Sequence, residues 1–294
     1  MTDQRRAYLY GMVTVLLWST VASAFKLSLR YMDPIQLLLY SSLTSITVLG
    51  LILKARGTLG RIFTYTARHY MLSLRQGFLL PFLYYIILLK AYDLLPAQVA
   101  QPLNYTWALT LAYLSVPLLR QKLHPREIVA GIICYSGVVV IVSRGQMPGL
   151  ESLNPLGVIL ALVSTIVWSL SWITSTRDDR DPVESLLTAF LFGLPFILAA
   201  CLLTSSVVVE DVRGLAGAAY VGVFEMGITF VFWLNALKLS KNTARVGNLI
   251  FLSPFISLLF IHFLVGEEIL VPTFAGLALI VAGLMVQGTG SSSP

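Results

Sequence analysis

The chain has 294 residues, of which 57% are hydrophobic and only 12% are charged, and its mean hydropathy is +0.82. A soluble protein cannot bury that much apolar surface, so the composition excludes a soluble domain and predicts an all-α polytopic membrane protein. The formal net charge of +6 does not indicate nucleic-acid binding, because the basic residues lie in short connections where membrane topology accounts for them.

Ten apolar stretches are long enough to cross a bilayer as helices of about 20 residues. In chain order they are 8–29, 35–53, 71–91, 97–119, 127–143, 155–175, 184–204, 215–237, 243–264 and 270–287. The small residues at 22–24 resemble a signal-peptidase site, but we interpret 8–29 as a retained first span. The tail, residues 289–294, is predicted to be disordered.

The distribution of Lys and Arg predicts the orientation. With the N-terminus in the cytoplasm, 15 of the 20 basic residues fall on the inner side, so both termini are expected to be cytoplasmic. The cysteines, Cys134 and Cys201, lie inside apolar spans and are expected to be small core residues. No metal-ligand cluster, phosphate loop or nucleophile–base pair is visible, so we expect neither an enzyme nor a cofactor or metal site.

Short matches recur in the two halves of the sequence. Trp18-Ser19 is followed by Asp33-Pro34, as Trp168-Ser169 is followed by Asp181-Pro182, and Ala91 and Ala236 have the same separation as Gly131 and Gly276. They predict a first repeat over residues 1–145 (spans 1–5) and a second over 146–288 (spans 6–10). Because five is odd, the second copy must enter the membrane from the opposite side. Inverted repeats of this kind are typical of secondary transporters, which bind solute near mid-membrane between the repeats.

Four segments carry a family resemblance: LLWST near Trp18, AYDLLPAQVAQPL entering the fourth span, ALKLSKNTARVGN entering the ninth, and Gly266-Glu267-Glu268 after it. They resemble the ten-helix, EamA-type branch of the drug/metabolite transporter superfamily. The short motifs Leu17-Trp18-Ser19-Thr20, Asn104-Tyr105-Thr106-Trp107 and Val167-Trp168 are similar to YddG-like exporters of aromatic and other amino acids. The resemblance implies two five-helix halves around a central cavity that carries solute out of the cell.

The fourth span carries polar residues on one face. Gln101, Asn104 and Trp107 fall within roughly a 120° arc of one helix. A polar arc that faces lipid is costly, so it should face protein or a wet cavity, although amides bonded within the protein are the alternative. Pro102 predicts a break in this span.

Trp18, Trp107, Trp168 and Glu225 are predicted to lie at similar depth on four helices from both halves. Converging aromatic faces suit an aromatic ligand and can hold an ammonium group by cation–π attraction, although ordinary helix packing is the alternative. As the only carboxylate at mid-depth, Glu225 is a candidate for proton coupling.

Three further aromatic residues complete the candidate substrate-binding set. Tyr84 and Tyr85 follow Pro81 in the third span and can offer hydroxyl groups. Trp172 follows Trp168 by one helical turn. An interfacial position is the competing interpretation for Trp172, as it is for Trp233.

The sequence therefore predicts a carrier of the bacterial inner membrane that exports aromatic and other large apolar amino acids, with a broader range left open. Alternating access around a mid-membrane cavity is the expected mechanism. The expected partners are the small-molecule substrate and membrane lipids, with no nucleic acid, and the expected state is a monomer. A carrier of drugs or other metabolites and a passive channel remain as alternatives.

Overall fold

The computed structural model describes residues 3–122, 124–143, 153–240, 246 and 248–288. Throughout these residues the chain consists of helices and short connections, with no strand. The predicted tail at 289–294, the predicted repeat boundary near 145 and the start of the ninth predicted span lie outside the described residues.

The chain divides into two compact units, each of which combines segments from both halves of the sequence. The first unit comprises residues 1–86 and 178–265, and the second comprises residues 87–177 and 266–294. The repeats predicted at 1–145 and 146–288 follow the sequence rather than these units, and they stay a prediction.

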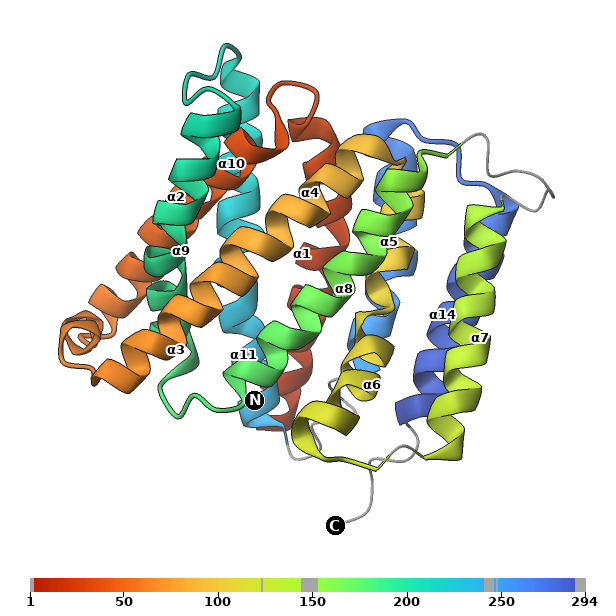
Figure 1. The fold of residues 1–294 in the computed structure, drawn as a ribbon, viewed down its shortest axis with the longest axis horizontal. Coiled ribbons are helices and arrows are strands. Elements are labelled where there is room, and N and C mark those ends of the chain that lie inside the picture. Colours follow the sequence, from red (N-terminus) through yellow and green to blue (C-terminus); the bar gives the residue numbers. More distant parts are fainter. Residues whose placement is uncertain (1–2, 123, 144–152, 241–245, 247, 289–294) are drawn as a thin grey trace. The chain divides into compact units, whose positions relative to one another are not determined.

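The first unit contains helices from both halves of the chain (Figure 1). They are α1 (Asp3–Ser28), α2 (Pro34–Ala55), η1 (Leu59–Phe63), α3 (Ala67–Gly77), η2 (Phe78–Tyr84), α9 (Pro182–Thr204), α10 (Val212–Phe224), α11 (Ile228–Leu239), η4 (Asn248–Leu252), α13 (Ser253–Phe260) and η5 (Ile261–Val265). The short elements η1 and η4 are 3₁₀-helices, and η2 and η5 are π-helical turns.

The second unit is built from the middle of the chain and its last helix. It contains most of α4 (Tyr85–Leu94), together with α5 (Ala97–Tyr105), α6 (Trp107–Leu119), α7 (Pro125–Val142), α8 (Pro155–Ser175) and α14 (Val271–Gly288).

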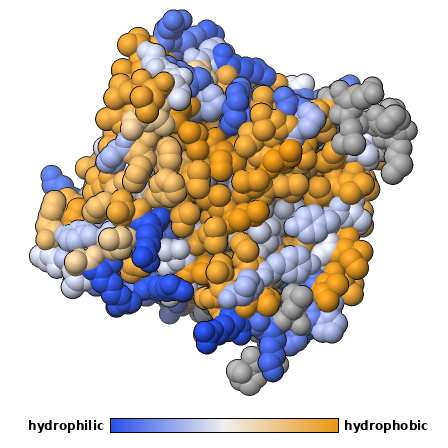
Figure 2. Space-filling model, in the orientation of Figure 1, coloured by the Kyte–Doolittle hydropathy of each residue, from blue (hydrophilic) through white to orange (hydrophobic). Residues whose placement is uncertain are grey.

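Eight helical stretches in the described part of the chain are long and apolar enough to cross a membrane. The two other predicted spans are helical but fall short of that length. Residues 97–119 divide into α5 and α6, and the apolar part of α14 is Val271–Gln287. The chain is therefore a multi-pass, all-helical membrane protein in its described part, and the count of ten spans stays a prediction. Hydrophobic residues cover most of the face shown in Figure 2.

The repeated Asp-Pro dipeptides start two helices. Asp33 caps α2 and accepts hydrogen bonds from the backbone N–H groups of Ile35 and Gln36, and Asp181 caps α9 in the same way. A carboxylate at this position satisfies N–H groups that have no partner within the helix, and proline fits the first helical position. The local sequence thus determines where both helices begin.

Helices α2 and α9 exchange contacts between their ends. The side-chain amide of Gln36 in α2 donates to the carbonyls of Ser206 and Val208, each at 2.9 Å, in the connection that follows α9. Glu184, at the equivalent position of α9, accepts a hydrogen bond from Tyr65 in the connection that follows α2. The start of each helix therefore lies beside the end of the other, so the two helices run antiparallel.

Close glycine contacts join α7 and α14, which lie side by side in Figure 1. A Cβ atom added to Gly137 would lie 2.5 Å from the carbonyl oxygen of Gly276, and one added to Gly276 would lie 2.5 Å from that of Gly137. Only glycine permits this approach, which packs the two helices within one chain. Cys134 and Cys201 are buried and form no disulfide with each other, which agrees with the prediction of small core residues.

Candidate functional site

The residues that the sequence singles out fall in both units. Trp18, Tyr84, Tyr85 and Glu225 belong to the first unit, and Gln101, Asn104, Trp107, Trp168 and Trp172 belong to the second. Each set is a local arrangement, and the convergence of the two sets on one cavity stays a prediction.

The three tryptophans of the second unit form one aromatic cluster. The ring centroid of Trp107 lies 6.2 Å from that of Trp168 and 6.3 Å from that of Trp172, and the last two are 6.4 Å apart. Trp107 and Trp172 are almost parallel, at 7°, and Trp168 meets both edge-on. Trp172 is 37% exposed, so the cluster is open on one side. Such a group of rings can bind an aromatic side chain.

A break in the helix places Trp107 in this cluster. The break falls at Thr106, between α5 and α6, whereas Pro102 lies within α5. The backbone N–H of Thr106 bonds to the carbonyl of Leu103 at 3.2 Å, one residue short of the usual helical partner. Trp107 is consequently the first residue of the new helix.

Side-chain hydrogen bonds hold α5 and α6 against α8. The amide of Asn104 donates to the hydroxyl of Ser164 at 2.9 Å, and the hydroxyl of Ser169 donates to the carbonyl of Trp107 at 3.1 Å. The serines of α8 are thus bonded partners as well as small contact residues. They fix the break beside the tryptophan cluster.

The two glutamines of α5 have different surroundings. Gln98 bonds to the backbone and side chains at the start of α14, where its carbonyl oxygen accepts from Leu270 at 3.1 Å and from Thr273 at 3.0 Å. Gln101 is 5% exposed, and its carbonyl oxygen has no hydrogen-bond partner among the described residues. Gln98 is therefore structural, and the role of Gln101 in substrate binding stays a prediction.

Trp18 of the first unit packs against α11. Its ring centroid lies 5.5 Å from that of Phe230, in an edge contact, and 5.8 Å from that of Trp233. The sequence favoured a position for Trp233 at the membrane interface. Its contact with Trp18 could not be seen from the order of residues in either helix.

Glu225 lies at a break between α10 and α11, in a stretch predicted as one continuous span. The hydroxyl of Ser45 in α2 donates to the carbonyl of Met226 at 2.7 Å, and the hydroxyl of Thr229 donates to the carbonyl of Phe224. Carbonyl groups freed from a membrane helix need such partners. The break is therefore stabilised by hydroxyl groups from the same unit.

Tyr85 donates a hydrogen bond to the carboxylate of Glu225 at 3.1 Å. Tyr85 is 1% exposed, follows the π-helical turn that contains Pro81, and meets the ring of Tyr84 edge-on at 4.9 Å. Glu225 is half-buried. The role of Glu225 in proton coupling and the role of the tyrosines in substrate binding stay predictions.

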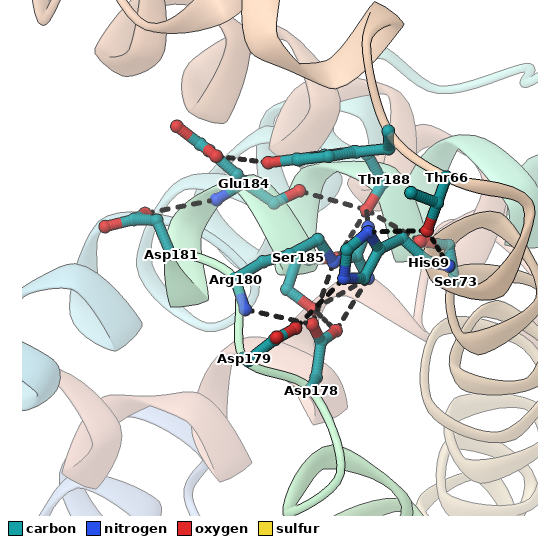
Figure 3. A network of polar contacts seen from close by, with 11 residues as sticks. Thr66, His69, Ser73, Asp178, Asp179, Arg180, Asp181, Glu184, Ser185 and Thr188 are labelled. Carbon is teal, nitrogen blue, oxygen red and sulfur yellow. Dashed lines mark hydrogen bonds and ion pairs between the residues drawn. The ribbon is translucent and has the colours of Figure 1, made fainter.

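A polar network around Asp178 and Arg180 was not visible from the sequence (Figure 3). Arg180 pairs with Asp178 at 2.6 Å, and both side chains are at least nine-tenths buried. Ser185 donates to the same carboxylate at 2.5 Å. Burial alone raises the pKa of Asp178, but the hydrogen bonds from Arg180 and Ser185 outweigh it and hold the pKa at about 2.

The network continues from residues 178–188 to the start of α3. His69 contacts the carboxylate of Asp179 at 2.9 Å, and Ser73 donates to Thr188 at 2.9 Å (Figure 3). Burial and the neighbouring Glu184 carboxylate raise the pKa of Tyr65 well above its ordinary value. The sequence explained Arg180 by membrane topology alone, because no local pattern shows that a charge is buried.

The profile of the EamA-like transporter family matches residues 5–143 and 155–288, which is most of the chain. The chain belongs to the EamA-like transporter family. Among the described residues of this EamA-like transporter, no group of three His, Cys, Asp or Glu side chains could hold a metal ion.

This EamA-like transporter is 27% identical over 256 residues to the aromatic amino acid exporter YddG of Ancylobacter novellus, covering 86% of each chain. An uncharacterized transporter of Archaeoglobus fulgidus is 22% identical over 286 residues, which cover 95% of this chain and 96% of the relative. A crystal structure with 21% sequence identity matches with a TM-score of 0.68, covering 97% of this chain and 96% of its own, and it shows the fold alone.

Proposed function

We propose that this EamA-like transporter exports aromatic and other large apolar amino acids across the bacterial inner membrane. The observation that carries the proposal is the cluster of Trp107, Trp168 and Trp172, with centroids 6.2 to 6.4 Å apart, beside a broken helix. Aromatic rings bind an apolar side chain, and the amides of Gln101 and Asn104 can donate to or accept from a zwitterion. The aromatic amino acid exporter of Ancylobacter novellus supports this substrate class.

The proposed mechanism is alternating access by ten spans in two inverted repeats, around a mid-membrane cavity and with both termini in the cytoplasm. The reciprocal contacts of α2 and α9 support it, because equivalent residues, Gln36 and Glu184, each reach the connection after the other helix. Such reciprocal contacts between antiparallel helices are expected of two equivalent helices in an inverted repeat. We expect the monomer to be the working unit.

The test is counterflow of labelled tryptophan and phenylalanine in proteoliposomes. Trp107→Ala should lower the initial rate by about tenfold or more, as expected when an aromatic anchor worth at least 1.4 kcal/mol is removed. Trp107→Phe should retain part of the rate. Phe263→Ala is the matched control, because Phe263 is 78% exposed and lies outside the cluster.

Equal rates for wild type and Trp107→Ala at equal abundance would falsify the proposal. Flux without saturation or counterflow would instead indicate a passive channel. Counterflow that drugs or other metabolites compete for, and amino acids do not, would assign a different cargo.

A further inference from the structure

We propose that Glu225 is the counter-ion for a primary ammonium group on the transported solute, and that Tyr85 positions its carboxylate. The inference rests on the proposed function and deepens it, because it assigns the charged group that the solute must carry. It also replaces the predicted proton-coupling role of Glu225 with a role in binding.

Glu225 lies at the depth at which a solute would be held within the membrane. It is at the centre of the candidate span Val212–Leu239. The neighbouring helix α1 meets this span on both sides of Glu225: Thr20 bonds to the hydroxyl of Tyr220 at 2.7 Å, and Trp18 contacts Phe230. Glu225 is therefore level with the middle of α1.

In the part of the chain that the structure describes, the carboxylate has no positive partner. Among the described residues, no Lys, Arg or His lies within ion-pair distance of Glu225, and its hydrogen-bond donor is the neutral hydroxyl of Tyr85. The titratable groups that face it are Tyr85 and, against Tyr85, Tyr84. A carboxylate at this depth is costly unless it is paired with a positive charge, so we assign that charge to the ligand.

The carboxylate is not needed to hold the fold at the break. The carbonyls of Phe224 and Met226 are satisfied by the hydroxyls of Thr229 and Ser45. Tyr85 donates to one carboxylate oxygen. No donor in the described segments bonds to the second oxygen, which can accept from the N–H groups of an ammonium.

The experiment compares two solutes that share a ring and differ in the ammonium group, tryptophan and indole-3-propionate, in proteoliposomes. Glu225→Gln should raise the KM for tryptophan at least about tenfold, because the variant removes the counter-ion of a desolvated charge. It should change the KM for indole-3-propionate less than about twofold. Tyr85→Phe should raise the KM for tryptophan by a smaller factor and leave the kcat unchanged.

Glu210→Gln is the matched control, because Glu210 is exposed and lies in the connection before α10. It should change neither KM. An equal rise for both solutes in Glu225→Gln would overturn the proposal. Loss of pH-gradient-driven accumulation with an unchanged KM for tryptophan would overturn it too, and would assign Glu225 to proton coupling.

A binding measurement separates this inference from the proposed function. If the wild type transports neither solute, the proposed function fails, and the thermal stabilisation by phenethylamine then decides the role of Glu225. Stabilisation of the wild type but not of Glu225→Gln would support the ammonium site. Equal stabilisation of both proteins, or of neither, would overturn it.

Discussion

Two Asp–Arg pairs in the first unit share a local sequence pattern and differ in their surroundings. Asp178 and Arg180, like Asp211 and Arg213, are separated by one residue, and their closest atoms are 2.6 and 2.5 Å apart. The side chains of the first pair are 9% and 3% exposed, whereas those of the second are 28% and 66% exposed. The same short motif therefore makes a buried ion pair in one place and a solvated one in the other.

The arginines also make the same kind of aromatic contact. Arg180 lies over the ring of Tyr65 at 4.9 Å, and Arg213 lies over the ring of Tyr31 at 4.3 Å. Tyr65, however, also bonds to Glu184 and so joins the pair to α9. We expect burial and shared hydrogen bonds, rather than pair geometry, to decide how much such a motif contributes to stability.

The largest effect is expected from Arg180→Gln. The substitution leaves the carboxylate of Asp178 buried without its charge partner, which should lower the free energy of unfolding by about 3 kcal/mol. Reversible unfolding in detergent micelles measures the change. If the free energy of unfolding falls as little as expected for an exposed pair, water reaches Asp178. The two Asp–Arg pairs would then contribute equally to stability.

Tyr65→Phe should have the next largest effect. The variant keeps the ring beneath Arg180 and removes the hydroxyl. Among the residues that the structure describes, the Glu184 carboxylate then retains Arg61 alone, at 3.8 Å and 67% exposed. We expect a loss of about 2 kcal/mol, the usual contribution of a hydrogen bond to a charged group. Tyr31→Phe is the matched change beside the exposed pair, and unfolding of both variants under one condition should show a loss for Tyr65→Phe alone.

Acid should weaken the buried pair. The pKa of Asp178 is about 2, below its value of about 3.9 in an unfolded chain, so its contribution to stability is complete above about pH 5. That contribution should decrease as the pH falls from about 5 towards 2, because the unfolded chain then binds the proton more readily. Unfolding of wild type and Asp178→Asn across this range should give a smaller pH dependence for the variant; parallel curves would contradict the expectation.

Arg213→Gln is expected to have the smallest effect. Its hydrogen bond with Asp211 lowers the pKa of that carboxyl, but solvent screens the pair. The loss in free energy of unfolding should be much smaller than that of Arg180→Gln, as for most exposed ion pairs. A loss equal to that of Arg180→Gln would mean that pair geometry matters more than burial.

The positions of the breaks in the helices were not predicted from the sequence. Residues 215–237 form one apolar run without proline, and they predict an unbroken span. The structure interrupts it at Glu225–Gly227, where Ser45 of a distant helix and Thr229 satisfy the freed carbonyls. Pro102 predicted a break in the fourth span, but the helix is interrupted at Thr106. A local stretch of sequence does not show these breaks, because hydroxyl groups that stabilise them come from residues brought close by tertiary packing.

Local sequence accounts for the class of the protein, the positions of most spans and the starts of α2 and α9. These features depend on the length of apolar runs and on single capping residues such as Asp33 and Asp181, which act within one helical turn. The folded arrangement alone brings Trp107, Trp168 and Trp172 into one cluster and buries Arg180. Both depend on which helices pack together, because burial and ring contacts join residues that lie far apart in the chain.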